Sequence, residues 1–437
     1  MNSGLADFLM IAIPAILTGG IVLALMVRRE LAPAVGLRGE QRWLLGLALG
    51  MGLVAFSIKL GVALILSSAP GATVEPLAAR DFGSAMMPDD DSVALIKAFI
   101  NPASGNGQRY VWERLPNQAP APAGLPTTAA RVTLGERLFN ERRLSGDGTL
   151  NCASCHDLTG HAGADGRPLA RGIAGQVGPR NTPTVWNAAF QSVLFWDGRA
   201  PSLEAQAGGP ILNPIEMGLA SAEEAERRLE GDADYRRLFA AAFGDAAVTF
   251  PRIVQALAAY ERTLITPDSP YDRFVDGDAG ALSPAQLRGM ALFEKLGCIL
   301  CHRGPNFSDA SLLGGQSALR YFPANPTPYE KRYPLLGADG RPGVWRVPSL
   351  RNVALTGPWL HNGSVDRLDE VVRIMASAQL GRSRQLQAWI DGESALHLAD
   401  QTPLPDAQVA DLVAFLEALS SDRLRRQAGL PADTRPE

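Results

Sequence analysis

The chain has 437 residues, which is more than one ordinary hydrophobic core organises, so we expect two or three structural units. Its net charge of −4 gives no basic footprint, and this argues against nucleic acid as a partner. Much of the 46% hydrophobic content is concentrated in the first seventy residues. All four cysteines fall in two short motifs, which leaves none for a disulfide or a thiol nucleophile.

Two apolar stretches open the chain, at residues 8–27 and 43–66, and each is close to the roughly 20 residues that cross a bilayer. The loop between them is basic, with Arg28, Arg29, Arg38 and Arg42. The positive-inside rule places this loop in the cytoplasm. A cleavable signal peptide is the alternative, but it needs a basic start that the first seven residues lack. We therefore predict a transmembrane hairpin over residues 1–67, with the rest of the chain outside the cytoplasm.

Lys59 lies within the second apolar stretch, where it is either a buried functional charge or a side chain that extends to the outer interface, and we favour the second interpretation. Residues 68–126 are rich in proline, alanine and glycine, so we interpret them as an extracytoplasmic linker or a clamp over the main body. From residue 127 onward the pattern is mainly helical. Capping boxes predict helix starts at Thr133 and Ser283, and each of these helices leads to a cysteine motif.

The two motifs are Cys152-Ala-Ser-Cys155-His156 and Cys298-Ile-Leu-Cys301-His302. This pattern is the attachment signature of c-type haem, because the two thiols bind the two vinyl groups of one porphyrin and the histidine becomes the proximal iron ligand. A shared zinc site or a dithiol redox pair would leave the adjacent histidines unexplained. We therefore predict two covalently bound haem c groups, held by Cys152 and Cys155 and by Cys298 and Cys301. Attachment of c-type haem outside the cytoplasm agrees with the topology.

An internal repeat relates the two haem regions. Pro183–Asn187 parallels Pro348–Asn352, and Trp196–Arg199 parallels His361–Ser364. The offset is constant, since 348−183 and 361−196 both equal 165. We therefore expect a mainly α fold with two cytochrome-c-like haem domains in tandem. We place the first haem domain at residues 127–270 and the second at residues 271–437.

The repeat also makes a prediction about the second axial position of each haem. Met375 is a candidate sixth ligand for the second haem, with His302 on the other side. The position 165 residues earlier is Pro210, which has no group that binds iron. The repeat therefore predicts one closed haem that relays electrons and one open haem that binds a small ligand.

Residues from about 128 to 425 resemble the bacterial diheme cytochrome c peroxidase family, which includes MauG-type enzymes. The resemblance is carried by five segments: Leu138–Gly146, Gly178–Val185, Phe195–Arg199, Ala259–Thr263 and Pro348–Thr356. It implies that His156 is the proximal ligand of the peroxidatic haem. It also implies that His302 and Met375 bind the electron-transfer haem, and that His361 lies near that haem without being its ligand.

The resemblance implies further roles. Trp196 matches the tryptophan between the two haems, and Gln206, Pro210 and Glu216 match the distal pocket, with Glu216 as the proton shuttle. Asn181, Thr356 and Pro358 match groups that hold one calcium ion between the lobes, partly through backbone oxygens.

One departure from the family pattern concerns the first haem. Many family peroxidases carry a distal histidine in the loop before Gly178, but the aligned position here is Gly172 or Ile173. His161 follows the proximal His156 too closely to reach the other haem face, and we read it as facing solvent; His397 has no counterpart and is read as a surface residue. We therefore expect the first haem to be open in the fully oxidised protein.

The expected activity is reduction of hydrogen peroxide to water by an inner-membrane enzyme with its catalytic domains in the periplasm. The expected electron donor is a small c-type cytochrome or a cupredoxin, with quinol as the alternative, and a homodimer is one of the oligomeric states left open. Two other functions stay open. One is a MauG-type oxidase that modifies a side chain of a partner protein, although the methylamine dehydrogenase maturation enzyme has tyrosine where Met375 stands. The other is a non-catalytic electron-transfer cytochrome or haem-based sensor, which would need neither an open iron nor the acid Glu216.

Overall fold

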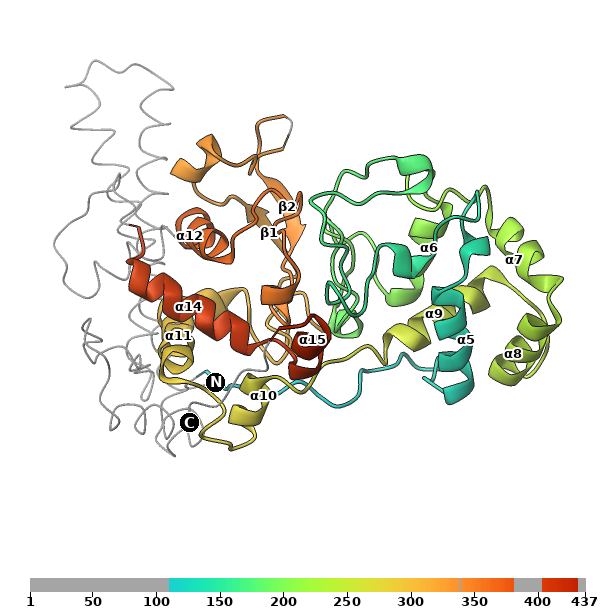
Figure 1. Cartoon of the computed structure of the whole chain (residues 1–437), viewed down its shortest axis with the longest axis horizontal. Coiled ribbons are helices and arrows are strands. Elements are labelled where there is room, and N and C mark those ends of the chain that lie inside the picture. The colour runs from blue at the N-terminus through green and yellow to red at the C-terminus, as the bar shows by residue number, and fades with distance from the viewer. Residues whose placement is uncertain (1–109, 338, 381–402, 431–437) are drawn as a thin grey trace, which may run out of the picture. The chain divides into compact units, whose positions relative to one another are not determined.

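The structure is a computed structural model that describes residues 110–337, 339–380 and 403–430 (Figure 1). The hairpin predicted over residues 1–67, including Lys59, and His397 lie outside the described residues. None of the helices in the described ranges has the length and apolar character needed to span a bilayer. The fold is mainly helical, as predicted, and its helices are α5 (Ala129–Phe139), α6 (Leu203–Leu212), α7 (Ala222–Glu230), α8 (Ala233–Phe243), α9 (Phe250–Glu261), α10 (Pro270–Val275), α11 (Pro284–Lys295), α12 (Leu368–Ala378), α14 (Asp406–Ala418) and α15 (Asp422–Gln427).

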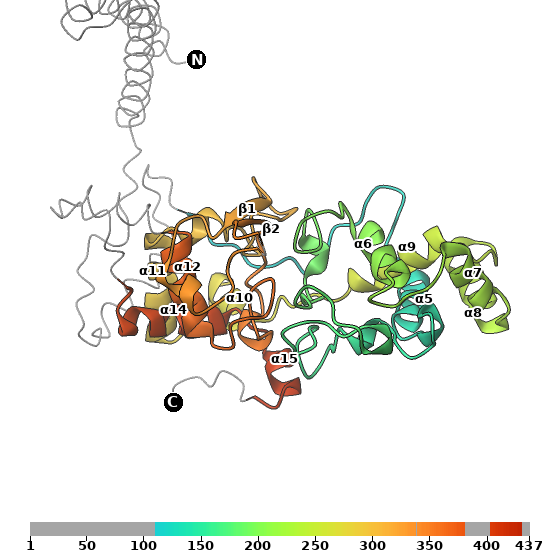
Figure 2. The same cartoon turned by 90° about the horizontal axis from the view of Figure 1, so that it is seen from above.

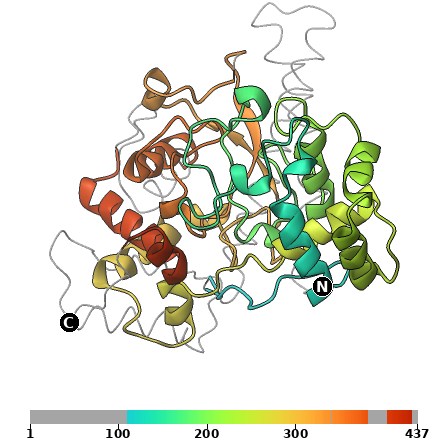
Figure 3. The same cartoon turned by 45° about the vertical axis from the view of Figure 1, so that its right-hand side comes forward.

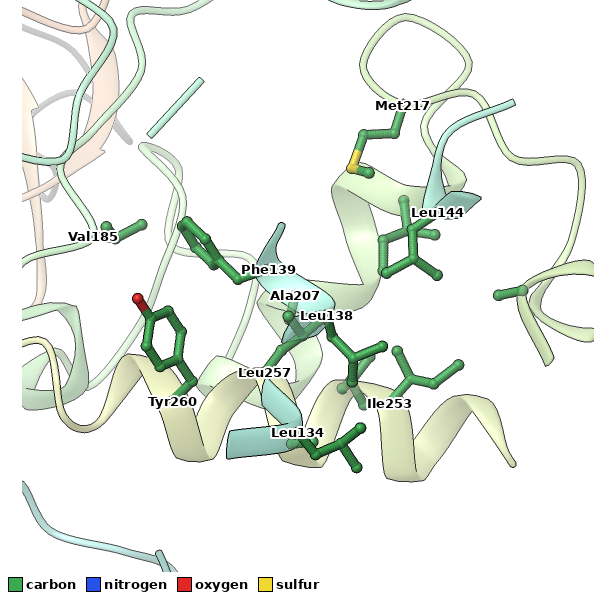
Figure 4. Close-up of a cluster of buried hydrophobic side chains, with 14 of the residues drawn as sticks. Leu134, Leu138, Phe139, Leu144, Val185, Ala207, Met217, Ile253, Leu257 and Tyr260 are labelled. Atoms are coloured by element: carbon green, nitrogen blue, oxygen red, sulfur yellow. The ribbon is translucent and has the colours of Figure 1, made fainter. Parts of the chain in front are cut away.

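The helices of the first lobe, α5 to α9, stay together in all three views (Figures 1, 2 and 3). Leu134 and Leu138 of α5 pack against Ile253 and Leu257 of α9, and all four side chains are buried (Figure 4). The two helices approach closely at Gly135, where a Cβ atom would lie 2.0 Å from the carbonyl oxygen of Ala256. Glycine is therefore required at this crossing.

The second lobe repeats this arrangement with α11 and α14. A Cβ atom at Gly289 of α11 would lie 1.9 Å from the carbonyl oxygen of Asp411, so the same kind of glycine crossing joins these helices. Leu287 and Met290 are buried against Leu412. Among the described residues the only sheet is a short antiparallel pair, β1 (Leu319–Phe322) and β2 (Gly343–Arg346), in this lobe.

The backbone carries the 165-residue repeat in detail. Asn187 and Asn352 both adopt the left-handed conformation, with φ of 62° and 61°. Each is followed by a short 3₁₀ helix, Ala188–Phe190 and Val353–Leu355. Helices α6 and α12 begin at Leu203 and Leu368, which are also 165 residues apart. The two lobes are therefore copies of one backbone path over this stretch, while the domain boundaries drawn from the sequence stay predictions.

One of the two predicted helix starts is wrong. The α5 helix begins at Ala129, with the Thr128 side chain accepting a hydrogen bond from the Arg131 amide, so Thr133 lies inside the helix. The Thr128 amide donates a hydrogen bond to the Pro126 carbonyl oxygen at 3.1 Å, so a tight turn leads the chain into the helix at Thr128, five residues before Thr133. The second start is confirmed: Ser283 and Gln286 form a reciprocal capping box at α11.

The part of the predicted linker that the structure describes contacts the second lobe. Trp112 packs against the core of that lobe and lies in edge-on contact with Tyr271 and Phe415. The Leu115 amide donates a hydrogen bond to Asp272, and Arg114 forms an ion pair with Asp276. Residues 112–115 therefore pack against the second lobe, while the role of residues 68–126 as a linker or a clamp stays a prediction.

Thr266 joins the two copies of the repeat. Its hydroxyl oxygen accepts hydrogen bonds from the side-chain amides of both Asn187 and Asn352, at 2.7 and 3.0 Å, and all three residues are buried. Because Thr266→Val leaves two buried donors without an acceptor, we expect it to lower the free energy of unfolding by about 2 kcal/mol or more. Urea unfolding of the haem-loaded protein measures this. The control is Thr149→Val at an exposed threonine, and equal urea midpoints for the two variants would contradict the role of Thr266.

Candidate functional site

Each cysteine motif forms one short turn after the long helix of its lobe. In both motifs the histidine amide donates a hydrogen bond to the carbonyl oxygen of the first cysteine, at 2.9 Å. The six residues line one continuous cavity: Cys152, Cys155, His156, Cys298, Cys301 and His302. Burial raises the pKa of the Cys152 thiol to about 12, whereas a dithiol redox pair needs a thiol of lowered pKa. The first motif is therefore unsuited to thiol redox chemistry.

The two histidines are oriented alike. His156 Nδ1 lies 3.0 Å from the carbonyl oxygen of Gly163, and His302 Nδ1 lies 3.1 Å from that of Phe307. An Nδ1–H that donates to a carbonyl leaves the lone pair on Nε2, which is the tautomer that binds a metal. Burial lowers the pKa of both imidazoles and so favours this neutral form. Two thiols and one such histidine on a shared cavity wall fit a covalently bound haem in each lobe.

The equivalent helices α6 and α12 carry the two positions compared in the sequence. Pro210 in α6 and Met375 in α12 both line the cavity. The first lobe thus presents a proline where the second presents a thioether, the soft ligand that a closed haem c uses. The structure brings these residues to the cavity as the repeat predicts.

The three residues matched to the distal pocket lie in α6 or shortly after it. Gln206, Pro210 and Glu216 all line the cavity, and the side-chain amide of Asn213 donates a hydrogen bond of 2.7 Å to Glu216 Oε1. Burial raises the pKa of the Glu216 carboxyl above its ordinary value, although the Arg199 charge and the Asn213 hydrogen bond lower it. A partly buried carboxyl of raised pKa binds a proton more readily than an exposed glutamate does, which suits a group that takes up and releases a proton.

The loop before Gly178, where many family peroxidases carry a distal histidine, is hydrogen-bonded to the segment that contains Glu216. The Ile173 amide donates to the Glu216 carbonyl oxygen at 2.7 Å, and the Ile173 side chain lies against Gly146 and Gly218. A Cβ atom at Gly172 would lie 1.8 Å from the Ile215 carbonyl oxygen, so no side chain fits there without movement of the backbone. His161 is about half exposed and is paired with Asp157, which agrees with its assignment to the solvent-facing surface.

Trp196 and His361 are equivalent positions of the repeat, and they contact each other where the lobes meet. Their ring centroids are 6.4 Å apart in an edge-on arrangement. The Arg346 amide donates to the Trp196 carbonyl oxygen at 2.6 Å, and the Asn181 amide donates to that of His361 at 3.0 Å. Since Arg346 also lies 165 residues after Asn181, these two bonds are one interaction made twice. Such an exchange is what a twofold relation between two copies generates.

His361 is buried against Trp345, whose ring stacks on it at 4.3 Å, and burial lowers the pKa of its imidazole to about 4. It is therefore a neutral aromatic neighbour of Trp196 at physiological pH. Trp196 is further oriented by a hydrogen bond from its indole Nε1 to the Asn181 carbonyl oxygen, at 2.8 Å.

The three residues matched to a calcium site, Asn181, Thr356 and Pro358, also line the cavity. The Asn181 side-chain amide donates to the carbonyl oxygens of Arg167 and Pro168, and Thr356 donates to that of Val353. The described residues contain no cluster of three or more His, Cys, Asp or Glu side chains that would hold a metal ion. A calcium ion here would therefore be bound by neutral oxygens and water, which Ca²⁺ accepts.

Sequence reasoning missed two buried charged residues of this cavity. Glu261 is almost fully buried, and burial raises the pKa of its carboxyl to about 8. Arg346 is also buried, and burial lowers the pKa of its guanidinium to about 10. Glu261 lies in a segment that carries the family resemblance, but nothing in the sequence shows its burial. Arg346 could have been found as the position equivalent to Asn181.

Comparison with known proteins agrees with this geometry. The sequence profile described as di-haem cytochrome c peroxidase matches residues 129–280. The cytochrome c551 peroxidase of Pseudomonas aeruginosa is 37% identical over 337 residues, which cover 74% of this chain and 88% of that protein. The chain belongs to the di-haem cytochrome c peroxidase family. It is accordingly an oxidoreductase of the class that acts on peroxide, and membership implies two haem c groups.

Other relatives lie on both branches of the family. The cytochrome c peroxidase Ccp of Escherichia coli is 39% identical over 314 residues, which cover 69% of this chain but only 60% of that protein. The methylamine utilization protein MauG of Methylophilus methylotrophus is 35% identical over 72% of this chain and 89% of that protein. Among solved structures, a MauG-like protein associated with microbial copper homeostasis is 31% identical, with a TM-score of 0.57 over 72% of this chain and 95% of its own. The diheme peroxidase BthA of Burkholderia thailandensis shares the fold, with a TM-score of 0.55 at 24% identity over 75% of this chain and 94% of its own.

Proposed function

We propose that this chain is a membrane-anchored diheme peroxidase that reduces hydrogen peroxide to water and whose first haem is open in the fully oxidised state. The observation that carries this proposal is the contrast between Pro210 and Met375 at equivalent places on α6 and α12. Cys152, Cys155 and His156 would hold the first haem, and Cys298, Cys301, His302 and Met375 the second. Bound haem would supply the redox-active iron that reduces peroxide.

The chain's own residues manage the proton and the orientation of the substrate. Glu216, as a carboxylate, takes a proton from one oxygen of the peroxide and returns it to the oxygen that leaves as water. Its Oε1 is held by Asn213, so Oε2 remains for the substrate. The Gln206 side chain, on the same wall, is placed to orient the peroxide by hydrogen bonding. The overall reaction consumes one peroxide, two protons and two electrons and releases two water molecules.

Electrons would enter through the second lobe and cross to the first near Trp196. The indole of Trp196 donates a hydrogen bond to the Asn181 carbonyl oxygen, and the Trp196 backbone carbonyl accepts one from the Arg346 amide, so the residue is fixed where the lobes meet. We propose a small c-type cytochrome or a cupredoxin as the donor, with quinol as the alternative. Leu300, inside the second haem motif, is about half exposed and offers such a donor an apolar contact beside that haem. A calcium ion at Asn181, Thr356 and Pro358 would bridge the two lobes.

We further propose that the hairpin over residues 1–67 anchors the enzyme in the inner membrane, with the haem domains in the periplasm. We expect the full chain to sediment with membranes and to resist extraction by alkaline carbonate, because two apolar spans insert far more stably than a surface contact. Fractionation of cells that produce the full chain measures this. Recovery of the intact chain in the soluble periplasmic fraction would contradict the anchor.

A MauG-type oxidase is the second candidate function, because MauG proteins are among the relatives and an open first haem suits this chemistry. Rapid oxidation of reduced cytochrome c by peroxide favours the peroxidase. An oxidised state that persists after peroxide until a protein substrate is added favours the oxidase. A pure electron-transfer role would show neither reaction.

A further inference from the structure

A second cavity, of about 380 Å³, adjoins the haem cavity at its distal end. Its walls come from Arg199 and the residues after it, and from Ala205, Gly209 and Asn213 in and after α6. Ala205 and Gly209 are solvent-exposed, so this cavity opens to the surface. We call it the vestibule. Its volume exceeds that of hydrogen peroxide by far and is in the range of cavities that hold small organic ligands.

Two residues line both cavities, namely Phe195 and Glu216. They therefore form the partition between the vestibule and the distal side of the first haem. Asn213, which binds Glu216 Oε1, lies on the vestibule side. A molecule in the vestibule can therefore contact the proposed catalytic carboxyl directly, and only Phe195 and Glu216 separate it from the haem cavity.

Phe195 is held in an unusual way. Its φ is 63°, and Leu360, the equivalent residue of the second lobe, has a φ of 70°, so both lobes hold a bulky side chain on the same left-handed turn. On one side its ring fits against Gly209, where an added Cβ atom would lie 3.0 Å from the Phe195 ring. On the other side the Arg199 guanidinium stacks on the ring, 3.5 Å from its centroid. Arg199 is itself paired with Asp197 at the exposed surface, so solvent-accessible groups hold the ring in place.

We propose that the vestibule is the route by which peroxide reaches the distal side of the first haem, and that the Phe195 ring, beside Glu216, limits the size of the hydroperoxides that pass into the haem cavity. This inference rests on the proposed function, because it assumes an open first haem on the inner side of the partition. Hydrogen peroxide and short alkyl hydroperoxides would pass beside the ring. Aryl hydroperoxides would enter the vestibule but would stop at Phe195.

The test is to obstruct the vestibule without changing the haem cavity. Ala205 is exposed, lines the vestibule and does not line the haem cavity, so Ala205→Trp fills the route from outside. Ala241→Trp, at an exposed alanine of α8, is the matched control. The probe is cyanide, whose association with and dissociation from the ferric full-length protein are followed by stopped-flow absorbance. An obstacle on a route slows both rates by the same factor and leaves the affinity unchanged.

We expect Ala205→Trp to slow cyanide association and dissociation by roughly 10-fold each, Ala205→Leu to slow them less, and Ala241→Trp to match the unmodified protein. Unchanged rates in Ala205→Trp would overturn the route. A weakened affinity without slower association would also overturn it, since that result means a damaged distal pocket. If the unmodified protein binds no cyanide, the open first haem fails instead, so the two failures are distinguishable.

Discussion

Replacing Glu216 with glutamine is expected to lower the turnover of hydrogen peroxide by about 100-fold or more, the usual effect of losing a general acid–base. Glutamine keeps the shape of the side chain and can keep the contact with Asn213 by rotating its amide, but it cannot accept and return a proton. Steady-state oxidation of reduced cytochrome c measures the effect. Both haems should stay bound, because Glu216 is not among the residues that would hold either haem or its iron.

The pH dependence provides a second readout of the same assignment. The carboxylate is the active form, so kcat/KM should fall as the pH drops through the pKa of Glu216. Since burial raises this pKa above the ordinary glutamate value, the decline should begin at a higher pH than for an exposed carboxyl. Glu216→Gln should lack this acid limb. A variant with full turnover, or one with low turnover that retains the acid limb, would contradict the role of Glu216.

Introducing methionine at Pro210 is expected to close the first haem. Pro210 holds the place on α6 that Met375 holds on α12, and both positions line the cavity, so a thioether at residue 210 should reach the first iron. Peroxide would then bind only to the fraction of molecules in which the methionine has dissociated, and its apparent affinity would fall in proportion. We expect peroxide turnover to drop by roughly 10-fold or more for this reason. Spectroscopy of the oxidised variant should show two low-spin haems.

The matched control is Pro210→Ala, which removes the same proline but adds no ligand. It should retain one high-spin haem and most of the reaction with peroxide. Equal losses in Pro210→Ala and Pro210→Met would show that the proline ring matters rather than the open position. A high-spin first haem in Pro210→Met would show that a methionine at residue 210 of α6 does not reach the first iron as Met375 of α12 is proposed to reach the second.

The sequence predicted the repeat because residues 183–203 and 348–368 align at one constant offset, with no insertion in either segment. With a constant offset, each residue of the first segment has one equivalent in the second. The left-handed turns at Asn187 and Asn352 therefore correspond, and so do the starts of α6 and α12. The helix start at Thr133 was wrong for the opposite reason. A capping box is a local pattern, and the cap that forms is Thr128, five residues earlier, which follows the turn at Pro126.

The contacts between the lobes could not be predicted from local patterns. The paired hydrogen bonds of Asn181 with His361 and of Arg346 with Trp196 depend on how the two copies meet, and the spacing within one copy does not contain this information. Burial is a similar case. Charged residues such as Glu261 and Arg346 are usually expected at the surface, yet both line the cavity. Burial raises the pKa of Glu261 and lowers that of Arg346, which favours the neutral form of each. The left-handed turn at Phe195 recurs at its repeat equivalent Leu360, but the contacts of the Phe195 ring with Arg199 and Gly209 are not visible in the sequence.

The central claim is that the first haem is open and the second closed, and low-temperature EPR of the fully oxidised, detergent-solubilised protein tests it most directly. The account predicts one high-spin and one low-spin ferric signal, both lost quickly after addition of one equivalent of hydrogen peroxide without prior reduction. Two low-spin signals that do not respond to peroxide would contradict it. They would mean that a residue other than those at positions 172, 173 and 210 closes the first haem.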